Sequence, residues 1–359
     1  MSGLGPVVAG RHVVICAGSG GVGKTTTAAT IAVGLAARGA RACVVTIDPA
    51  RRLAASLGLQ ELSNEPQLVD GARFAEQGVE VRGELWAMML DPKATLDDLV
   101  ERMAPDADAG AEILANRIYR ELSGAVAGTQ EYTAMAKLHD LHASGRFDVI
   151  VLDTPPSRNA LDFIDAPDRL TGFLEGRALR TLVAGSGVAA RVVGRGTSAV
   201  LGVLGRVTGT DLLRDIGTFV RSLGALLDGF RARARDIKAL LADPATTFVL
   251  VSSPQREPAA EAVFFAERLR DAGLGVGGLV VNAVHEAPGE VGDLSRLEPA
   301  LAARVARTSD ELAVLAARDA ESVAGLELAL GVSAVVVPHL AADVHDAAGL
   351  AAVHAHLFP

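Results

Sequence analysis

The residues best suited to chemistry form one short segment near the start of the chain, which reads GSGGVGKT from Gly18 to Thr25. This spacing fits G-x-x-x-x-G-K-[ST], a loop whose successive backbone N–H groups surround a polyphosphate. Lys24 is expected to pair with the outer phosphates, and the Thr25 hydroxyl to ligate Mg²⁺. The segment therefore predicts a site for a nucleotide and Mg²⁺. The other phosphate-binding positions predicted here are Gly20, Gly21, Val22, Gly23 and Thr26.

Two aspartates end apolar runs and are candidates for metal binding and for water activation. Asp153 closes FDVIVLD, a strand-like run that would deliver its carboxylate beside the phosphate loop. There it would hold Mg²⁺ through a water molecule. Asp48 closes a second run, in TIDPARRL, where it would either orient the attacking water or cap the helix after Pro49. The spacing alone supports these two interpretations of Asp48 equally.

These side chains need a sheet that brings the ends of several strands together, and the apolar runs predict one. Strand-like runs alternate with helical periodicity, as expected for a parallel sheet covered on both faces. The predicted fold class is therefore α/β, with a doubly wound, mainly parallel sheet. The predicted strands span 12–17, 42–47, 85–90, 147–152, 247–251, 279–281 and 334–337. The predicted helices span 25–38, 94–103, 109–122, 131–142 and 297–330.

The composition excludes several classes of protein. Half of the 359 residues are hydrophobic, and the formal net charge of −9 argues against nucleic-acid binding. We expect no transmembrane segment, because no apolar run reaches about 18 residues, and no signal peptide, so that the protein would be cytoplasmic. Cys16 and Cys43 lie in separate apolar runs, which predicts buried thiols and neither a zinc site nor an iron–sulfur cluster. His139 and His142 have metal-ligand spacing but no third ligand, which favours ordinary surface histidines.

Three segments, GSGGVGKTTTAATIA, TIDPARRLAASLG and FDVIVLDTPPSRNALDF, resemble the nucleotide segments of the ArsA/Get family. This family comprises the ATPases that drive arsenite pumps and the ATPases that target tail-anchored membrane proteins. The resemblance extends to FVLVSSPQREPAAEAVFFAERLRDAG, GLVVNAV and VVPHLAADVHDAAGL, and so covers about the whole chain. It implies a P-loop NTPase fold of the signal-recognition-particle/MinD type and a dimer that encloses two ATP molecules.

The resemblance implies roles for the residues at the phosphate end of the site. Lys24 and Thr25 match the phosphate lysine and the Mg²⁺-binding hydroxyl. Asp48 matches the catalytic aspartate, which favours water activation over a helix cap, and Asp153 matches the switch II aspartate. Lys24 and Asp48 are therefore predicted to be catalytic, with ATP as substrate and Mg²⁺ as cofactor.

The resemblance also implies a base end of the site. Asn282 matches the asparagine that contacts adenine, to which its amide would offer a donor and an acceptor; a turn residue after a strand is the alternative. Pro338, His339 and Leu340 match the loop that lines the adenine. Gln255 stands where the family often has a glutamate close to the nucleotide of the dimer.

The chain departs from the family pattern at Ser19, where many members have a lysine that reaches the nucleotide of the other subunit. Three explanations stay open: slow hydrolysis, replacement by Arg51, Arg52 or Arg158, or a heterodimer in which a paralogue supplies the lysine. The arginines would otherwise be solvated residues of the switch segments. Arg158 and Asn159 also replace the Gly-His pair usual in the family, which alters the coupling expected of that segment.

We expect residues 1–359 to form a single ATPase domain with a helical subdomain inserted in it, made of about 94–142 and 165–242. The insert would either form an apolar groove for a client's transmembrane helix or pack on itself. Its basic run at 231–238 indicates a solvated helix face, or else a contact with acidic lipid or an acidic partner. No cysteine lies in this region, so we do not expect arsenite binding.

The function predicted is an Mg²⁺-dependent ATPase that couples nucleotide-driven closure of a dimer to a membrane-protein client or transporter. The dimer would be a homodimer or a heterodimer with a paralogue. One alternative is a low-activity nucleotide-binding subunit of such a heterodimer. Another is a MinD/ParA-like positioning ATPase, although the C-terminal AAVHAHLFP lacks the basic residues that membrane or DNA binding would need.

Overall fold

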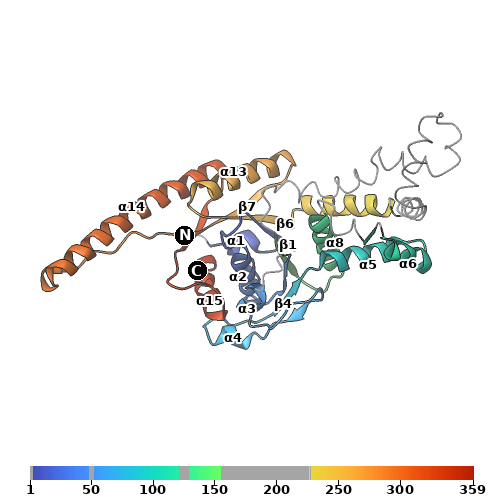
Figure 1. The fold of residues 1–359 in the computed structure, drawn as a ribbon, viewed down its shortest axis with the longest axis horizontal. Helices are drawn as coiled ribbons and strands as arrows, with labels where there is room; N and C mark the ends of the chain where they lie inside the picture. The colour runs from blue at the N-terminus through green and yellow to red at the C-terminus, as the bar shows by residue number, and fades with distance from the viewer. Residues whose placement is uncertain (1–2, 48–51, 118, 121–128, 155–225, 227) are drawn as a thin grey trace, which may run out of the picture. The chain divides into compact units, whose positions relative to one another are not determined.

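The computed structural model describes residues 3–47, 52–117, 119–120, 129–154, 226 and 228–359 (Figure 1). The chain divides into two compact units. One unit consists of Met1–Leu90, Asp140–Ala160 and Leu241–Pro359, and the other of Asp91–His139 and Leu161–Leu240. The first unit contains a large sheet, whereas the described part of the second unit is helical.

An eight-stranded sheet forms the centre of the first unit, in the order β3-β4-β2-β5-β1-β6-β7-β8. Every neighbouring pair is parallel except β3 and β4, which pair antiparallel at one edge. The mainly parallel α/β fold predicted from the sequence is therefore confirmed. The strands are β1 (Val13–Ala17), β2 (Arg41–Thr46), β3 (Gln67–Leu68), β4 (Glu84–Met89), β5 (Val149–Asp153), β6 (Thr246–Ser252), β7 (Val276–Val284) and β8 (Ala334–Pro338).

Two strands differ from the sequence prediction, for different physical reasons. β3 was not predicted, because a two-residue strand is too short to show a periodic pattern. β7 was predicted only over 279–281, yet it begins at Val276. Gly277 and Gly278 interrupt the apolar run at its start, but a side chain on Gly277 would clash with Thr247 of the neighbouring strand. Glycine therefore allows the two strands to approach closely at a point where the sequence pattern looks weak.

Helices cover both faces of the sheet (Figure 1). The helix α2 (Lys24–Ala37) follows β1 and is buried along most of its length, because α15 (Ala347–Leu357) packs against it on the same face. The helices α13 (Arg256–Asp271) and α14 (Pro299–Leu330) connect β6 to β7 and β7 to β8 on the other face. Short helical segments complete the described part of this unit: α1 (Gly5–Val8), α3 (Arg52–Ser56), α4 (Ala72–Ala75) and the 3₁₀ helix η2 (Leu294–Arg296).

The second unit contains α5 (Pro92–Met103), α6 (Ala107–Ala115), most of α8 (Thr129–Ala143) and a helical segment from residue 228 onward. The carboxylates of Asp91 and Asp106 begin α5 and α6 by accepting a hydrogen bond from a backbone N–H three residues later. The helix predicted over 109–122 is interrupted. α6 ends at Ala115, because Asn116 adopts an extended conformation, and Arg117, Tyr119 and Arg120 are helical again.

The basic run at 231–238 is helical, and the ring of His139 lies against it: Nδ1 is 2.7 Å from Nη1 of Arg233. Within the parts of the chain that the structure describes, no group of three or more His, Cys, Asp or Glu side chains is arranged to hold a metal. None of the helices described there combines the length and apolar character that crossing a bilayer requires.

Candidate functional site

The glycine-rich loop between β1 and α2 has a conformation that its glycines make possible. Gly23 precedes the first residue of α2 and has φ of 92°, a left-handed conformation that other residues adopt at a cost. Gly18 lies so close to β6 that a Cβ there would overlap the carbonyl oxygen of Val251. The loop is therefore held tightly against the sheet, and the N-terminus of the 14-residue helix α2 opens toward it.

Lys24 is the first residue of α2, and its side chain is only 6 % exposed. Its Nζ donates a hydrogen bond of 2.6 Å to the carbonyl oxygen of Ser19, across the mouth of the loop. Ser19 itself is buried, and its hydroxyl donates to the carboxylate of Glu261 on α13. The position where the resemblance led us to expect a lysine thus holds a serine that bonds to a neighbouring helix of the same chain.

Thr25, Thr46 and Asp153 form a compact group of oxygen atoms where β2, β5 and α2 meet. The hydroxyls of Thr25 and Thr46 donate to Oδ2 of Asp153 over 2.7 and 2.8 Å, and Asp153 is 1 % exposed. Hydroxyl and carboxylate oxygens are the hard donors that Mg²⁺ prefers, and Thr25 also faces the solvent-filled side of the loop. The group therefore fits a magnesium ion held by Thr25 directly and by Asp153 through water.

Cys16 lies on β1 next to Asp153, and both predicted buried cysteines, Cys16 and Cys43, are buried. Burial raises the pKa of the Cys16 thiol far above its ordinary value, and the charge of Asp153 adds to this effect. The carbonyl of Cys16 accepts hydrogen bonds from the backbone and the hydroxyl of Thr154. Cys16 therefore remains a neutral thiol that packs beside the site, with no role as a nucleophile.

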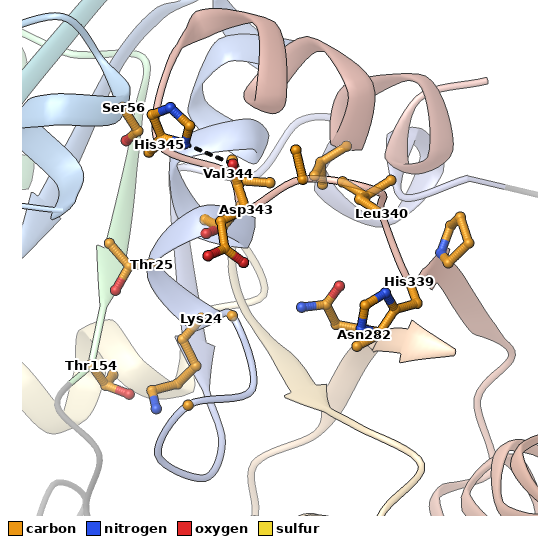
Figure 2. Close-up of a pocket in the computed structure, with 17 residues that line it drawn as sticks. Lys24, Thr25, Ser56, Thr154, Asn282, His339, Leu340, Asp343, Val344 and His345 are labelled. Atoms are coloured by element: carbon orange, nitrogen blue, oxygen red, sulfur yellow. Dashed lines mark hydrogen bonds between the residues drawn. The ribbon is translucent and has the colours of Figure 1, made fainter. Parts of the chain in front are cut away.

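A cavity of about 610 Å³ opens beside the loop, and Figure 2 shows the side chains around it. Lys24, Thr25 and Thr26 line it from the side of the loop and α2, together with Gly21 and Gly23. Asn282, Pro338, His339 and Leu340 line it from the carboxyl ends of β7 and β8, and the Asn282 amide lies close to Gly23. Ligands of open α/β sheets bind at this edge, and the volume is in the range of small-molecule sites. The structure thus brings the two groups of predicted residues together around one space.

Asn282 lies near the carboxyl end of β7 and lines the cavity there. Its Nδ2 donates a hydrogen bond of 3.0 Å to the carbonyl of Val22 in the glycine-rich loop. This contact ties β7 to the loop while the side chain still lines the cavity. Among the residues that sequence reasoning missed, Asp343 and His345 line the cavity after β8, and Asp343 points into the space between Thr25 and Asn282 in Figure 2.

Not every predicted residue lies at this cavity. Gly20 is exposed and Val22 is buried beneath the loop, so neither lines the space. Gln255 begins α13 and lies in a separate hollow of about 640 Å³ between α13 and α14, with Arg318 and Leu326. Asp48, Arg51, Arg158 and Asn159, and the side chain of Arg52, lie outside what the structure describes.

The sequence model of the anion-transporting ATPases, the ArsA family, matches residues 11–298. The chain belongs to the ArsA family. The matched range holds the glycine-rich loop, Asp153 and Asn282, whereas the wall of the cavity from Pro338 to His345 lies beyond it. The match therefore covers the residues of the loop and β7 at the cavity, but not the wall that follows β8.

Individual members of the ArsA family match shorter parts of the chain. The ATPase GET3 of Malassezia globosa is 29 % identical over 159 residues, which are 44 % of this chain and 43 % of that protein. The ATPase ARSA2 of Chlamydomonas reinhardtii is 28 % identical over 245 residues, or 67 % and 59 %. The ATPase get3 of Aspergillus terreus is 31 % identical over 155 residues, or 43 % and 42 %. The chain therefore spans less than two thirds of the length of these relatives.

Proposed function

We propose that the chain binds ATP with Mg²⁺ in the 610 Å³ cavity and hydrolyses it. The observation that carries this proposal is that one cavity is lined by Lys24, by Thr25, which is bonded to Asp153, and by Asn282. A triphosphate and a base need these two kinds of contact within one space. Membership of the ArsA family supports the same reaction, since its members are described as ATPases.

At the phosphate end, the triphosphate would lie against the backbone N–H groups of the loop and the N-terminus of α2. Lys24 would then exchange its hydrogen bond to the Ser19 carbonyl for one to the outer phosphates. Thr25 and Asp153 would hold Mg²⁺, which when bound neutralises the charge that develops on the transferred phosphoryl group. Asp48 is proposed, from the family resemblance, to orient the water that attacks the γ-phosphate.

At the base end, Asn282 is proposed to contact adenine. One amide proton of its Nδ2 already bonds to Val22, which fixes the orientation of the amide plane. The second amide proton and the carbonyl oxygen would then be available to the edge of the base. Pro338 and His339 would cover the base from the side of β8.

We also propose, from the family resemblance, that ATP hydrolysis is coupled to a conformational change of a dimer. GET3 and ARSA2 proteins are among the relatives, which supports a dimer that opens and closes with the nucleotide. A membrane-protein client or transporter and a cytoplasmic location belong to the same proposal. The neutral hydroxyl of Ser19 gives no charge to a nucleotide in another subunit, so an isolated homodimer would hydrolyse ATP slowly unless an arginine takes that role.

Steady-state release of phosphate from Mg²⁺-ATP tests the proposed reaction. Lys24→Ala should lower turnover about 100-fold or more, because it removes a charge that stabilises the transition state. Lys93→Ala is the matched control, since Lys93 is an exposed lysine of α5 paired with Asp97, and it should leave turnover unchanged. Turnover that is equal in wild type and Lys24→Ala would exclude this cavity as the site of hydrolysis.

A second function, a low-activity subunit that pairs with a lysine-bearing paralogue, is favoured by the contact between Ser19 and Glu261. Ser19→Lys should then raise turnover strongly. Because Glu261 lies next to this position and would bind the new ammonium, the substitution is also made together with Glu261→Gln. A wild-type chain that binds ATP but turns it over only after these changes would support the heterodimer. Unchanged turnover in both variants would speak against it.

A further inference from the structure

Asp319 is a fully buried carboxylate on α14, far along the chain from the cavity residues. Its Oδ2 accepts hydrogen bonds from the backbone N of His285 over 3.0 Å and from Nδ1 of the same residue over 2.7 Å. Its Oδ1 accepts from Nη2 of Arg318 over 2.9 Å. Burial opposes a charge at this position, but these hydrogen bonds hold the pKa of Asp319 below its ordinary range. Burying a carboxylate costs free energy unless hydrogen bonds compensate for the lost water. The three groups that donate to Asp319 supply this compensation.

The segment that Asp319 holds is the irregular, strained end of β7, just after Asn282. Ala283 has φ of 57°, a left-handed conformation that a residue other than glycine adopts at a cost, and such strain gathers at ligand sites. The register between β7 and β8 also shifts between Val281 and Val284. The strained end of β7 persists because the two residues that follow Ala283 are anchored. His285 is anchored by Asp319, and the carbonyl of Val284 accepts a bond of 2.9 Å from the backbone N of His339.

The rings of His285 and His339 extend this anchor to the cavity wall. Their centroids are 5.6 Å apart and their planes are inclined by only 21°, so the rings stack. His339 lines the cavity beside Asn282, as Figure 2 shows, whereas neither His285 nor Asp319 lines it. The orientation of the His339 ring, which a base would contact, thus depends on Asp319, which the base would not contact.

We infer that Asp319 and His285 are positioning residues for the base of the bound nucleotide. Together they hold Asn282 and His339 in the orientation that the base contacts. This inference rests on the proposed nucleotide function of the cavity and adds to it two residues behind the cavity wall, Asp319 on α14 and His285 after β7. It makes the base end of the site dependent on α14, while the phosphate end depends on the loop and α2.

Comparison of two ligands separates this role from a general role in folding. Calorimetric titrations with Mg²⁺-ATP and with Mg²⁺-tripolyphosphate, carried to millimolar concentration, measure binding with and without the base. Asp319→Asn and His285→Ala should weaken ATP about tenfold, a typical loss for one broken contact to a charged group. The affinity for tripolyphosphate should stay within about twofold, because the phosphate end is untouched. Asp310→Asn, at an exposed position of the same helix, is the matched control and should change neither affinity.

His285→Asn provides rescue, since its amide N–H can take the place of Nδ1 and donate to Asp319. It should retain more ATP affinity than His285→Ala. If Asp319→Asn unfolds, the affinities of His285→Ala and His285→Asn for ATP and for tripolyphosphate are compared instead. Equal losses for both ligands, or no loss for either, would overturn the inference while leaving the nucleotide site intact. A wild-type chain that binds neither ligand would instead contradict the proposed function itself.

Discussion

Three side chains, Lys24, Thr25 and Asp153, define the chemistry of the phosphate end of the cavity. Lys24 supplies the positive charge, and the hydroxyl and carboxylate supply hard oxygen donors 2.7 Å apart. Lys24 and Asp153 are almost completely buried, so their electrostatic effects are stronger than they would be in water. The glycines of the loop matter equally, because they allow the backbone to pass close to both the sheet and the ligand.

Gly18 provides a test of this close approach. Gly18→Ala should lower the free energy of unfolding by about 2–3 kcal/mol, because its Cβ would overlap the backbone of β6, which cannot rotate away. Gly39→Ala is the control: Gly39 has φ of 95° but open space around it, so its loss should be about 1 kcal/mol. Urea unfolding measures both. Equal losses would show that backbone conformation, and not the contact with β6, sets the cost.

Sequence reasoning succeeded at this scale where the chemistry is concentrated in a few consecutive residues. The spacing of Lys24 and Thr25 within eight residues identifies the loop because the motif itself defines the geometry. Asp343 and Asp319 gave no such signal. Their relation to the cavity depends on the path of the chain after β8 and on the packing of α14 against β7, which no local pattern encodes.

At the scale of elements, the carboxyl ends of the parallel strands bring the site together. β5, β7 and β8 each end at or beside a residue that lines the cavity, and these strands are separated by long stretches of sequence. Apolar runs predicted most of the sheet, because strands buried on both faces need them. The short edge strand and the glycine-containing start of β7 were missed, since neither forms such a run.

The starts of β2 and β5 are joined by an ion pair with a predictable pH dependence. Nη2 of Arg41 donates to Oδ1 of Asp148 over 2.7 Å, and the backbone N of Arg41 donates to Oδ2 over 2.8 Å. These bonds hold the pKa of Asp148 below its ordinary range. The carboxylate therefore stabilises the fold above about pH 4, and this contribution is lost as the pH falls through the lowered pKa.

Asp148→Asn should accordingly be slightly less stable than wild type at pH 7, and the difference should disappear in strong acid. The effect is small because both side chains are about half exposed. Thermal unfolding from pH 7 down to about pH 2 measures the difference, with Glu76→Gln at an exposed position of the same unit as control. A difference between wild type and Asp148→Asn that stays constant with pH would contradict the assignment of the lowered pKa.

At the scale of the whole molecule, the sheet unit holds the complete described cavity, and the second unit is helical where described. The proposed coupling to a client would require two states of a dimer that bind the nucleotide differently. The oligomeric state with and without the nucleotide therefore tests whether the cavity controls the proposed dimer.

Nucleotide-dependent dimerisation is the prediction at this scale. With Asp48→Asn, which should block hydrolysis but not binding, Mg²⁺-ATP should shift the chain to twice its mass in light scattering. Mg²⁺-ADP should not produce the same shift, because the γ-phosphate is absent. A mass of one chain with either nucleotide would contradict a homodimer and direct attention to a paralogue, whereas a mass of two chains with both would contradict assembly that depends on the γ-phosphate.

The most direct test of the nucleotide site is the affinity of the chain for Mg²⁺-ATP with and without the ammonium group of Lys24. Titration calorimetry should give one ATP per chain for the wild type and an affinity at least about tenfold weaker for Lys24→Ala, since a buried charge contact is lost. An affinity that is unchanged by Lys24→Ala, or a wild-type chain that binds no ATP, would contradict the assignment of this cavity as the nucleotide site.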